Sequence, residues 1–144
     1  LELLFPNEYI PSSSERMLLY RELDSLELDK DVLSFKERLE DRFGKVPPEG
    51  QELLRIVPLR RLAKRLGAEK IFLKAGRMTL FFVSNPDSPY YQSAAFGKCI
   101  GYMGTHPRFC NLREQNGKRS MVVKNVENVE TAVSILQEIV SMEG

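Results

Sequence analysis

Residues 109–124 read FCNLREQNGKRSMVVK and carry the strongest hairpin signal in the chain. Asn116 and Gly117 can both adopt a positive φ, as a two-residue hairpin turn requires. We therefore predict strands at residues 109–114 and 118–124. A second hairpin is predicted upstream, where apolar runs at residues 71–73 and 78–83 flank residues 75–77. We expect the two upstream strands to be mostly buried.

Each hairpin is followed by a helical pattern. After the turn residues 85–89, a helix ends around Gly101 and Gly104, and a last helix spans about residues 128–142. The first of these helices is expected to bury Ala95, Phe96, Cys99, Ile100 and Met103. The second is expected to bury Val129, Ala132, Val133, Leu136 and Val140.

The first half of the chain predicts three helices. Serines cap the first, over about residues 13–27, and the second starts at Asp29 or Asp31 and ends at Gly44. The third opens at Pro47-Pro48, and Pro58 should kink it or divide it in two. The sequence thus predicts an α+β fold in which three N-terminal helices precede two β-hairpins, each followed by a helix. The helices should cover a mainly antiparallel sheet of about four strands.

Composition limits the possible functions. The chain has 144 residues, 42% hydrophobic and 28% charged, with 21 basic against 20 acidic side chains. This suits one compact domain or two small ones, and a net charge of +1 excludes overall attraction to a polyanion. We expect an extended linker strap over residues 1–11 and a single C-terminal regulatory domain over residues 12–144. The apolar residues 1–5 suggest a fragment of a longer protein. Because no apolar run approaches membrane-spanning length, a cytoplasmic location is expected.

Motifs for catalysis, metals and cofactors are weak. Cys99, His106 and Cys110 could supply soft ligands to zinc, but their spacing fits no closed site and a fourth ligand is missing. Gly97-Lys98 resembles the end of a phosphate loop, yet the required upstream glycine is Gln92 and no hydroxyl follows the lysine. We therefore expect no catalytic residue, no metal and no cofactor in this chain.

Two charged surfaces remain. The cations of the third helix could hold phosphates or simply complement the helix dipole, and they are Arg60, Arg61, Lys64 and Arg65. In the second helix, Leu39 and Phe43 point inward, which turns the charged residues between them towards solvent or a partner.

The chain also resembles a known family at specific positions. The matching residues are Tyr9-Ile10-Pro11, Arg16, Tyr20, Leu39, Asp41-Arg42-Phe43-Gly44, Pro47, Leu53-Leu54, Leu59-Arg60 and Leu66-Gly67. Together they resemble the C-terminal domain of the bacterial transcription-repair coupling factor, the Mfd family. The resemblance is sharpest from Tyr9 to Ile71.

The resemblance implies a regulatory module of an ATP-dependent DNA translocase that acts in nucleotide excision repair. Such a domain is expected to clamp a UvrB-like module of the same protein and to mask recruitment of UvrA until RNA polymerase is bound. RNA polymerase and DNA would be reached through other domains, with no membrane involved. By position, the family's clamp contacts fall at Asp41 and Arg42, and Arg38 lies one helical turn before them. The alternative is an accessory nucleic-acid-binding domain that uses the basic third helix.

Overall fold

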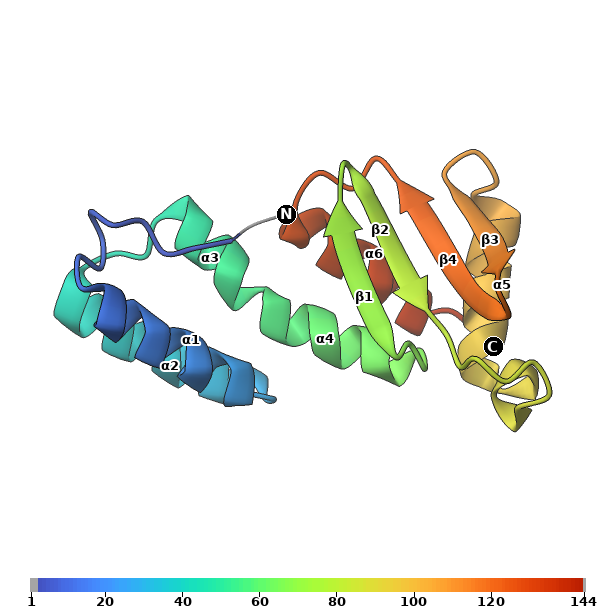
Figure 1. Ribbon diagram of the computed structural model, residues 1–144, viewed down its shortest axis with the longest axis horizontal. Helices are drawn as coiled ribbons and strands as arrows, with labels where there is room; N and C mark the ends of the chain where they lie inside the picture. Colours follow the sequence, from blue (N-terminus) through green and yellow to red (C-terminus); the bar gives the residue numbers. More distant parts are fainter. Residues whose placement is uncertain (1–2, 144) are drawn as a thin grey trace. The chain divides into compact units, whose positions relative to one another are not determined.

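The computed structural model describes residues 3–143, and the chain forms two compact units, one running to Pro58 and the other beginning at Leu59 (Figure 1). Residues 1 and 2, which belong to the predicted strap, and residue 144 lie outside the described residues. The strap over residues 1–11 and the single domain over residues 12–144 stay predictions.

The first unit is helical. It contains α1 (Ser13–Ser25), α2 (Asp29–Phe43), α3 (Pro48–Leu54) and the start of α4 (Ile56–Arg65). The Ser12 hydroxyl accepts a hydrogen bond from the N–H of Glu15, which caps α1 as expected. Helix α2 ends at Gly44, whose φ of 87° is readily available only to glycine. Its end is therefore where the sequence predicts it.

Pro58 divides the third predicted helix, as expected. Helix α3 ends at Leu54, Arg55 lies between the helices, and α4 begins at Ile56. Proline has no N–H for the carbonyl of Leu54, four residues earlier, and its ring clashes with that carbonyl. The break therefore falls immediately before the turn that Pro58 would otherwise disrupt.

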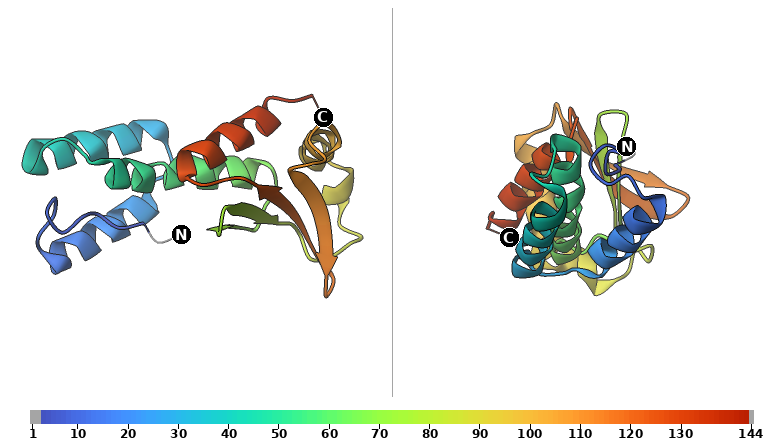
Figure 2. Two further views of the ribbon diagram at one scale, coloured as in Figure 1. Left: turned by 90° about the horizontal axis from the view of Figure 1, so that it is seen from above. Right: turned by 90° about the vertical axis from the view of Figure 1, so that its left-hand side faces the viewer.

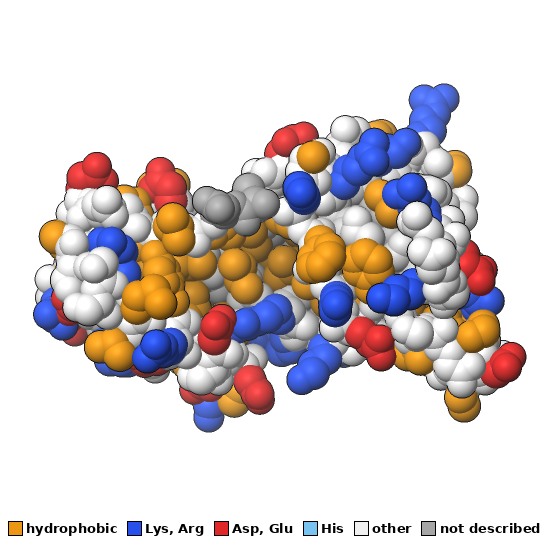
Figure 3. Space-filling model, viewed as in Figure 1, with side chains coloured by type: hydrophobic (Ala, Val, Ile, Leu, Met, Phe, Trp, Pro, Cys, Tyr) orange, Lys and Arg blue, Asp and Glu red, His pale blue; other side chains and the backbone are white. Residues whose placement is uncertain are grey.

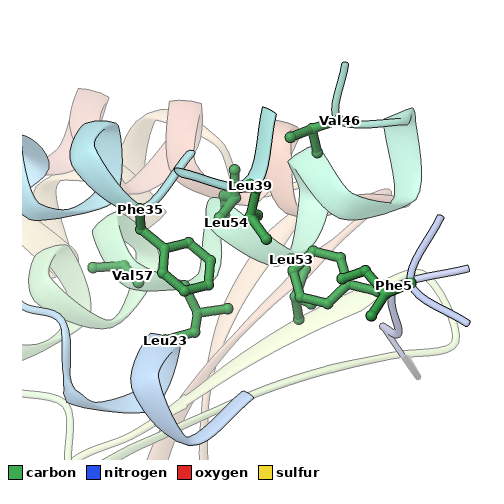
Figure 4. Close-up of a cluster of buried hydrophobic side chains, with 9 residues drawn as sticks. Phe5, Leu23, Phe35, Leu39, Val46, Leu53, Leu54 and Val57 are labelled. Carbon is green, nitrogen blue, oxygen red and sulfur yellow. The ribbon is translucent and has the colours of Figure 1, made fainter. Parts of the chain in front are cut away.

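The core of the first unit joins its N-terminal segment to its helices (Figure 4). Phe5 is fully buried, its ring stacks on Tyr20 at a centroid distance of 5.6 Å, and its N–H donates to the Tyr20 hydroxyl at 3.0 Å. A turn follows, in which the N–H groups of Tyr9 and Ile10 both donate to the carbonyl of Pro6. The cluster comprises Phe5, Ile10, Leu23, Phe35, Leu39, Val46, Leu53, Leu54 and Val57. These nine side chains tie residues 5–10 to the helices.

The second unit contains the sheet. Its strands are β1 (Lys70–Lys74), β2 (Arg77–Phe81), β3 (Cys110–Gln115) and β4 (Lys118–Lys124), all antiparallel in the order β1-β2-β4-β3. Both hairpin turns have two central residues with positive φ, Ala75-Gly76 and Asn116-Gly117. Between and after the hairpins lie a 3₁₀ turn (Pro89–Gln92), α5 (Ala94–Thr105) and α6 (Val129–Val140). The α+β prediction is confirmed.

Helices α5 and α6 lie on one side of the sheet, and neither covers its other face, where Phe72 and the outer positions are exposed but Ser120 and Val122 on β4 are buried (Figure 2). Two burial predictions are therefore wrong. Strand β1 is not mostly buried, because it is an edge strand whose Phe72 points to the open face with 56% of its surface exposed. In α5, Ile100 is exposed and Tyr102 is buried instead, because the buried side of the helix passes through Phe96, Cys99 and Tyr102.

Gly67 provides a test of this packing. It ends α4 with φ +82°, and a Cβ there would lie 2.1 Å from the Tyr90 ring, whose hydroxyl donates to the carbonyl of Leu66. Gly117 also has a positive φ, but nothing lies within 4 Å of its Cβ position. We expect Gly117→Ala to lower the free energy of unfolding by about 1–2 kcal/mol through backbone strain alone, and Gly67→Ala by about 2–5 kcal/mol. Urea denaturation measures both; equal losses would contradict the ring contact.

Candidate protein-docking surface

Helix α2 is fixed in its rotation by two side chains one turn apart. Phe35 and Leu39 are both buried in the core of the first unit. Because an α-helix has 3.6 residues per turn, burial of Phe35 and Leu39 places Arg38, Asp41 and Arg42 on the solvent side of α2. All three are exposed. We call these three residues the α2 surface.

The two arginines of the α2 surface pair with helix α1. The Arg38 guanidinium donates to a carboxylate oxygen of Glu22, and Arg42 Nη1 lies at ion-pair distance from Glu15 Oε1 without the alignment of a hydrogen bond. The order of the pairs, Glu15 with Arg42 and Glu22 with Arg38, is that of two antiparallel helices. The hydrogen bond that Arg38 donates to the Glu22 carboxylate raises the pKa of Arg38 above its usual value, so this side chain is always charged.

The arginines also lie against aromatic rings of their own helix. The Arg38 guanidinium carbon lies 5.6 Å from the centroid of the Phe35 ring, and that of Arg42 lies 5.1 Å from the centroid of the Phe43 ring. Cation–π contacts of this kind hold each stem in a defined direction. Even so, 59% of the Arg38 side chain and 67% of the Arg42 side chain remain exposed. Each guanidinium therefore keeps N–H donors for a further acceptor.

Asp41 differs from the two arginines. It is exposed, and no hydrogen bond or ion pair joins its carboxylate to any part of the chain that the structure describes. The α2 surface thus presents one uncompensated carboxylate beside two oriented cations that can accept a second partner. This arrangement suits charge-assisted hydrogen bonds to a protein surface that carries both signs of charge.

The sequence patterns did not reveal Glu15 and Glu22. The spacing of Ser12 and Glu15 matches a helix-capping box, in which the glutamate would reach back to the cap. In the structure only half of that motif forms: Ser12 caps the N–H of Glu15, and the carboxylate lies at Arg42. The seven-residue spacing of the two glutamates on one helix face is the signal that could have indicated a partner helix.

The second predicted surface, on α4, has fewer side chains available to bind a partner. Lys64 and Arg65 are exposed, whereas Arg60 and Arg61 are half-buried and each already takes part in an interaction. Arg60 and Lys64 are four residues apart, as are Arg61 and Arg65, so the four cations form two neighbouring rows along the helix. Their role in binding nucleic acid stays a prediction.

The three residues considered for zinc are two buried cysteines and a half-buried histidine. Cys99 and Cys110 are buried free thiols, and burial raises the pKa of Cys99 to about 12 and that of Cys110 to about 11. His106 follows the end of α5 and stacks on Tyr102 at a centroid distance of 3.9 Å. Within residues 3–143, no group of three or more His, Cys, Asp or Glu side chains could hold a metal ion. In the same range, no helix is long and apolar enough to cross a membrane.

The structure therefore has an α+β fold with a charged helix surface suited to protein contacts. The family model of the TRCF domain matches residues 1–93, which is more than half of the chain. The chain belongs to this family.

Curated relatives and a solved structure agree with this assignment. The chain is similar to the transcription-repair-coupling factor of Rickettsia bellii, with 32% identity over 87 residues, 60% of this chain and 8% of that protein. It is also similar to that of Escherichia coli, with 34% identity over 68 residues, 47% of this chain and 6% of that protein. The aligned region thus spans less than a tenth of these relatives.

The fold is also similar to a crystal structure of the C-terminal domain of a transcription-repair coupling factor. The TM-score is 0.68 at 17% sequence identity, with 96% of this chain and 89% of that chain covered. The match extends beyond residue 93, where the family model ends. The second unit therefore has the same fold as the corresponding part of that domain.

The buried thiols give a prediction about reactivity. We expect neither Cys99 nor Cys110 to react with a disulfide reagent in the native protein at about pH 8, and both to react in concentrated urea. Because burial raises both pKa values from 9.0, folding favours the protonated thiols. Their contribution to stability should be complete below about pH 9 and should be lost as the pH rises towards 12. Rapid labelling of the native chain would contradict this burial.

The helix-to-helix ion pair gives a prediction about stability. Glu22→Gln and Arg38→Gln, alone and together, form a double-mutant cycle measured by urea denaturation. Because both side chains are partly solvated, we expect a coupling free energy of about 0.2–1 kcal/mol that decreases with added salt. A coupling above about 2 kcal/mol would show that the pair is a structural element and not an exchangeable surface contact.

Proposed function

We propose that this chain is the non-catalytic, autoinhibitory interaction domain of a bacterial transcription-repair coupling factor. It clamps the UvrB-like module of the same protein and masks the surface that recruits UvrA until RNA polymerase is bound. The parent is an ATP-dependent DNA translocase of the cytoplasm, and RNA polymerase and DNA are reached through its other domains. Membership of the TRCF domain family and the likeness to a solved C-terminal domain support this proposal.

The observation that carries the proposal is the α2 surface. Asp41 has no partner within the described part of the chain, and it lies beside Arg38 and Arg42, which α1 holds in place. The carboxylate can accept hydrogen bonds from a partner's cation, while the arginines can donate to a partner's carboxylate without leaving Glu22 and Glu15. The surface is therefore ordered before the partner arrives, which lowers the entropic cost of docking.

The energetics suit a contact that opens. Each exposed ion pair contributes only about 0.2–1 kcal/mol, so a few such pairs favour the closed state without making it permanent. A ligand that binds the open state more tightly can then shift the equilibrium by its own differential affinity. Binding of RNA polymerase by the parent supplies that difference in this proposal.

The alternative function, an accessory nucleic-acid-binding domain, depends on Arg60, Arg61, Lys64 and Arg65. The exposure of Lys64 and Arg65 supports it. The existing interactions of Arg60 and Arg61 count against it, because those would have to be given up or shared. Salt-dependent binding of duplex DNA that is lost in Lys64→Ala with Arg65→Ala would favour this alternative.

Calorimetric titration of the chain with the separately expressed UvrB-like module tests the proposal. We expect Asp41→Ala with Arg42→Ala to weaken binding by about tenfold or more, because two charge-assisted contacts are lost. The same substitutions should lower the thermal unfolding midpoint by only a few degrees, because both side chains are exposed and the one intramolecular ion pair that is lost, between Arg42 and Glu15, is partly solvated.

The matched control is Glu27→Ala with Lys30→Ala. It also removes one charge of each sign from exposed residues, near the opposite end of α2. Unaltered affinity in this control, together with loss in the Asp41 and Arg42 variant, supports the docking surface. Equal affinity of all three proteins for the module would overturn the assignment of the α2 surface.

A further inference from the structure

The open face of the sheet has an unusual composition. Side chains alternate between the two faces of a strand, and the pairing register identifies which positions share the face opposite α5 and α6. On this face, Phe72 lies opposite Thr79, Thr79 opposite Val122, and Val122 opposite Asn111. Positions two residues away on each strand point the same way. We call this surface the open sheet face.

Charge on the open sheet face has one sign. It carries six cations, which are Lys70, Lys74, Arg77, Arg113, Lys118 and Lys124. No strand position on this face is occupied by Asp or Glu, although the whole chain has 21 basic and 20 acidic residues. Figure 3 shows Lys and Arg side chains gathered around apolar ones over the sheet. The neutral average of the chain therefore conceals a locally basic surface.

Part of this face is hollowed. A groove of about 290 Å³ is lined by cations from β2, β4, β3 and the loop before β3, namely Arg77, Lys124, Arg113 and Arg108. All four are exposed, and none has an ion pair with any of the residues 3–143. The lining includes Asn111 and contains no carboxylate. Such a groove is suited to the oxygens of a polyanion.

Exposed aromatic rings accompany the cations. Phe109 lines the groove with 45% of its surface exposed, and Phe72 is 56% exposed near the other edge of the sheet. Phe72 is held by an edge contact with the Phe81 ring at a centroid distance of 5.4 Å, which leaves a face of the ring free for stacking. Phe72 on β1 and Asn111 on β3 lie at opposite ends of one row across the four strands. With a spacing of about 4.8 Å between neighbouring strands, the two positions are about 14 Å apart.

Protection of sheet edges does not account for this pattern. Lysines on an edge strand discourage pairing with another chain, which is sufficient reason for Lys70 and Lys74 on β1. Arg77 and Lys124, however, lie on the two central strands β2 and β4, opposite each other in the register. An exposed phenylalanine on the edge strand would also promote association instead of preventing it.

We infer that the open sheet face binds single-stranded nucleic acid. Phosphates lie along the groove on Arg77, Lys124, Arg108 and Arg113, and unstacked bases lie on Phe109 and Phe72. A duplex hides the faces of its bases, so the aromatic rings favour a single strand. This site shares no residue with the cations of α4 or with the α2 surface, so it stands or fails independently of the proposed autoinhibition.

Fluorescence anisotropy with a labelled oligothymidylate tests the inference on the 144-residue chain. We expect saturable binding at low salt, tighter than that of a duplex of equal length. Arg77→Ala with Lys124→Ala should weaken it by at least about tenfold and reduce the slope of log affinity against log salt by about 1.4, since two phosphate contacts are lost. Phe72→Ala should weaken it by about tenfold with little change in that slope.

Controls separate this site from general basicity. Lys30→Ala with Lys45→Ala removes the same charge from exposed residues of the first unit and should leave binding unchanged. Asp41→Ala with Arg42→Ala should also retain it. Unfolding midpoints within a few degrees of that of the unsubstituted chain would show that the variants fold.

Four results of the oligonucleotide titrations would overturn the inference, and a fifth comes from a competing peptide. They are absence of binding at low salt, equal loss in the Lys30 and Lys45 control, loss only on substitution of Lys64 and Arg65, and unchanged binding by Phe72→Ala. Capture of a polyglutamate peptide in place of the oligonucleotide would show that the face binds an acidic protein instead, and would equally overturn it.

Discussion

Burial of Phe35 and Leu39, one helical turn apart, is the constraint on which the candidate docking surface depends. Their place in the core of the first unit sets the rotation of α2 and turns Arg38, Asp41 and Arg42 to solvent. The charged residues are thus positioned by apolar ones, whose burial supplies far more free energy than any exposed ion pair. Evolution can therefore alter the contacts of this surface with little effect on the fold.

In the second unit, too, buried apolar side chains determine which side chains face the solvent, here on a sheet. Helices α5 and α6 cover one face, which buries Met78, Leu80, Met121 and Val123 of the central strands, and the other face carries a different set of side chains. The two surfaces differ in kind. The α2 surface mixes both signs of charge, as suits a protein partner, whereas the open sheet face combines cations with exposed rings. A single net charge for the chain describes neither of them.

Local signals predicted much of the fold. Asn116-Gly117 specified a hairpin turn, Gly44 ended a helix and Pro58 divided one, because each acts through its own backbone conformation. Burial was harder to predict. The exposure of Phe72 depends on β1 lying at the edge of the sheet, and that order arises from pairing between distant strands. A run of apolar residues has the same appearance at an edge as in the centre.

The candidate site was only partly predictable for a similar reason. The periodicity of α2 turned its charges outward, but the partners of Arg38 and Arg42 lie on another helix, about 16–27 residues earlier in the chain. Nothing local to α2 indicated Glu22 or Glu15. The family resemblance predicts that this face of α2 is a docking surface. The exposure and the ion pairs of its residues are consistent with that role, which stays a prediction.

The most direct test of the central claim is to map amide chemical shifts of the isotope-labelled chain by nuclear magnetic resonance while the unlabelled UvrB-like module is added. The account predicts that the largest shift changes cluster on α2 around residues 38–42 and on the facing turns of α1, with the sheet largely unaffected. Changes confined to the sheet or to α4, or no changes at saturating module, would contradict the claim that the α2 surface is where this domain docks.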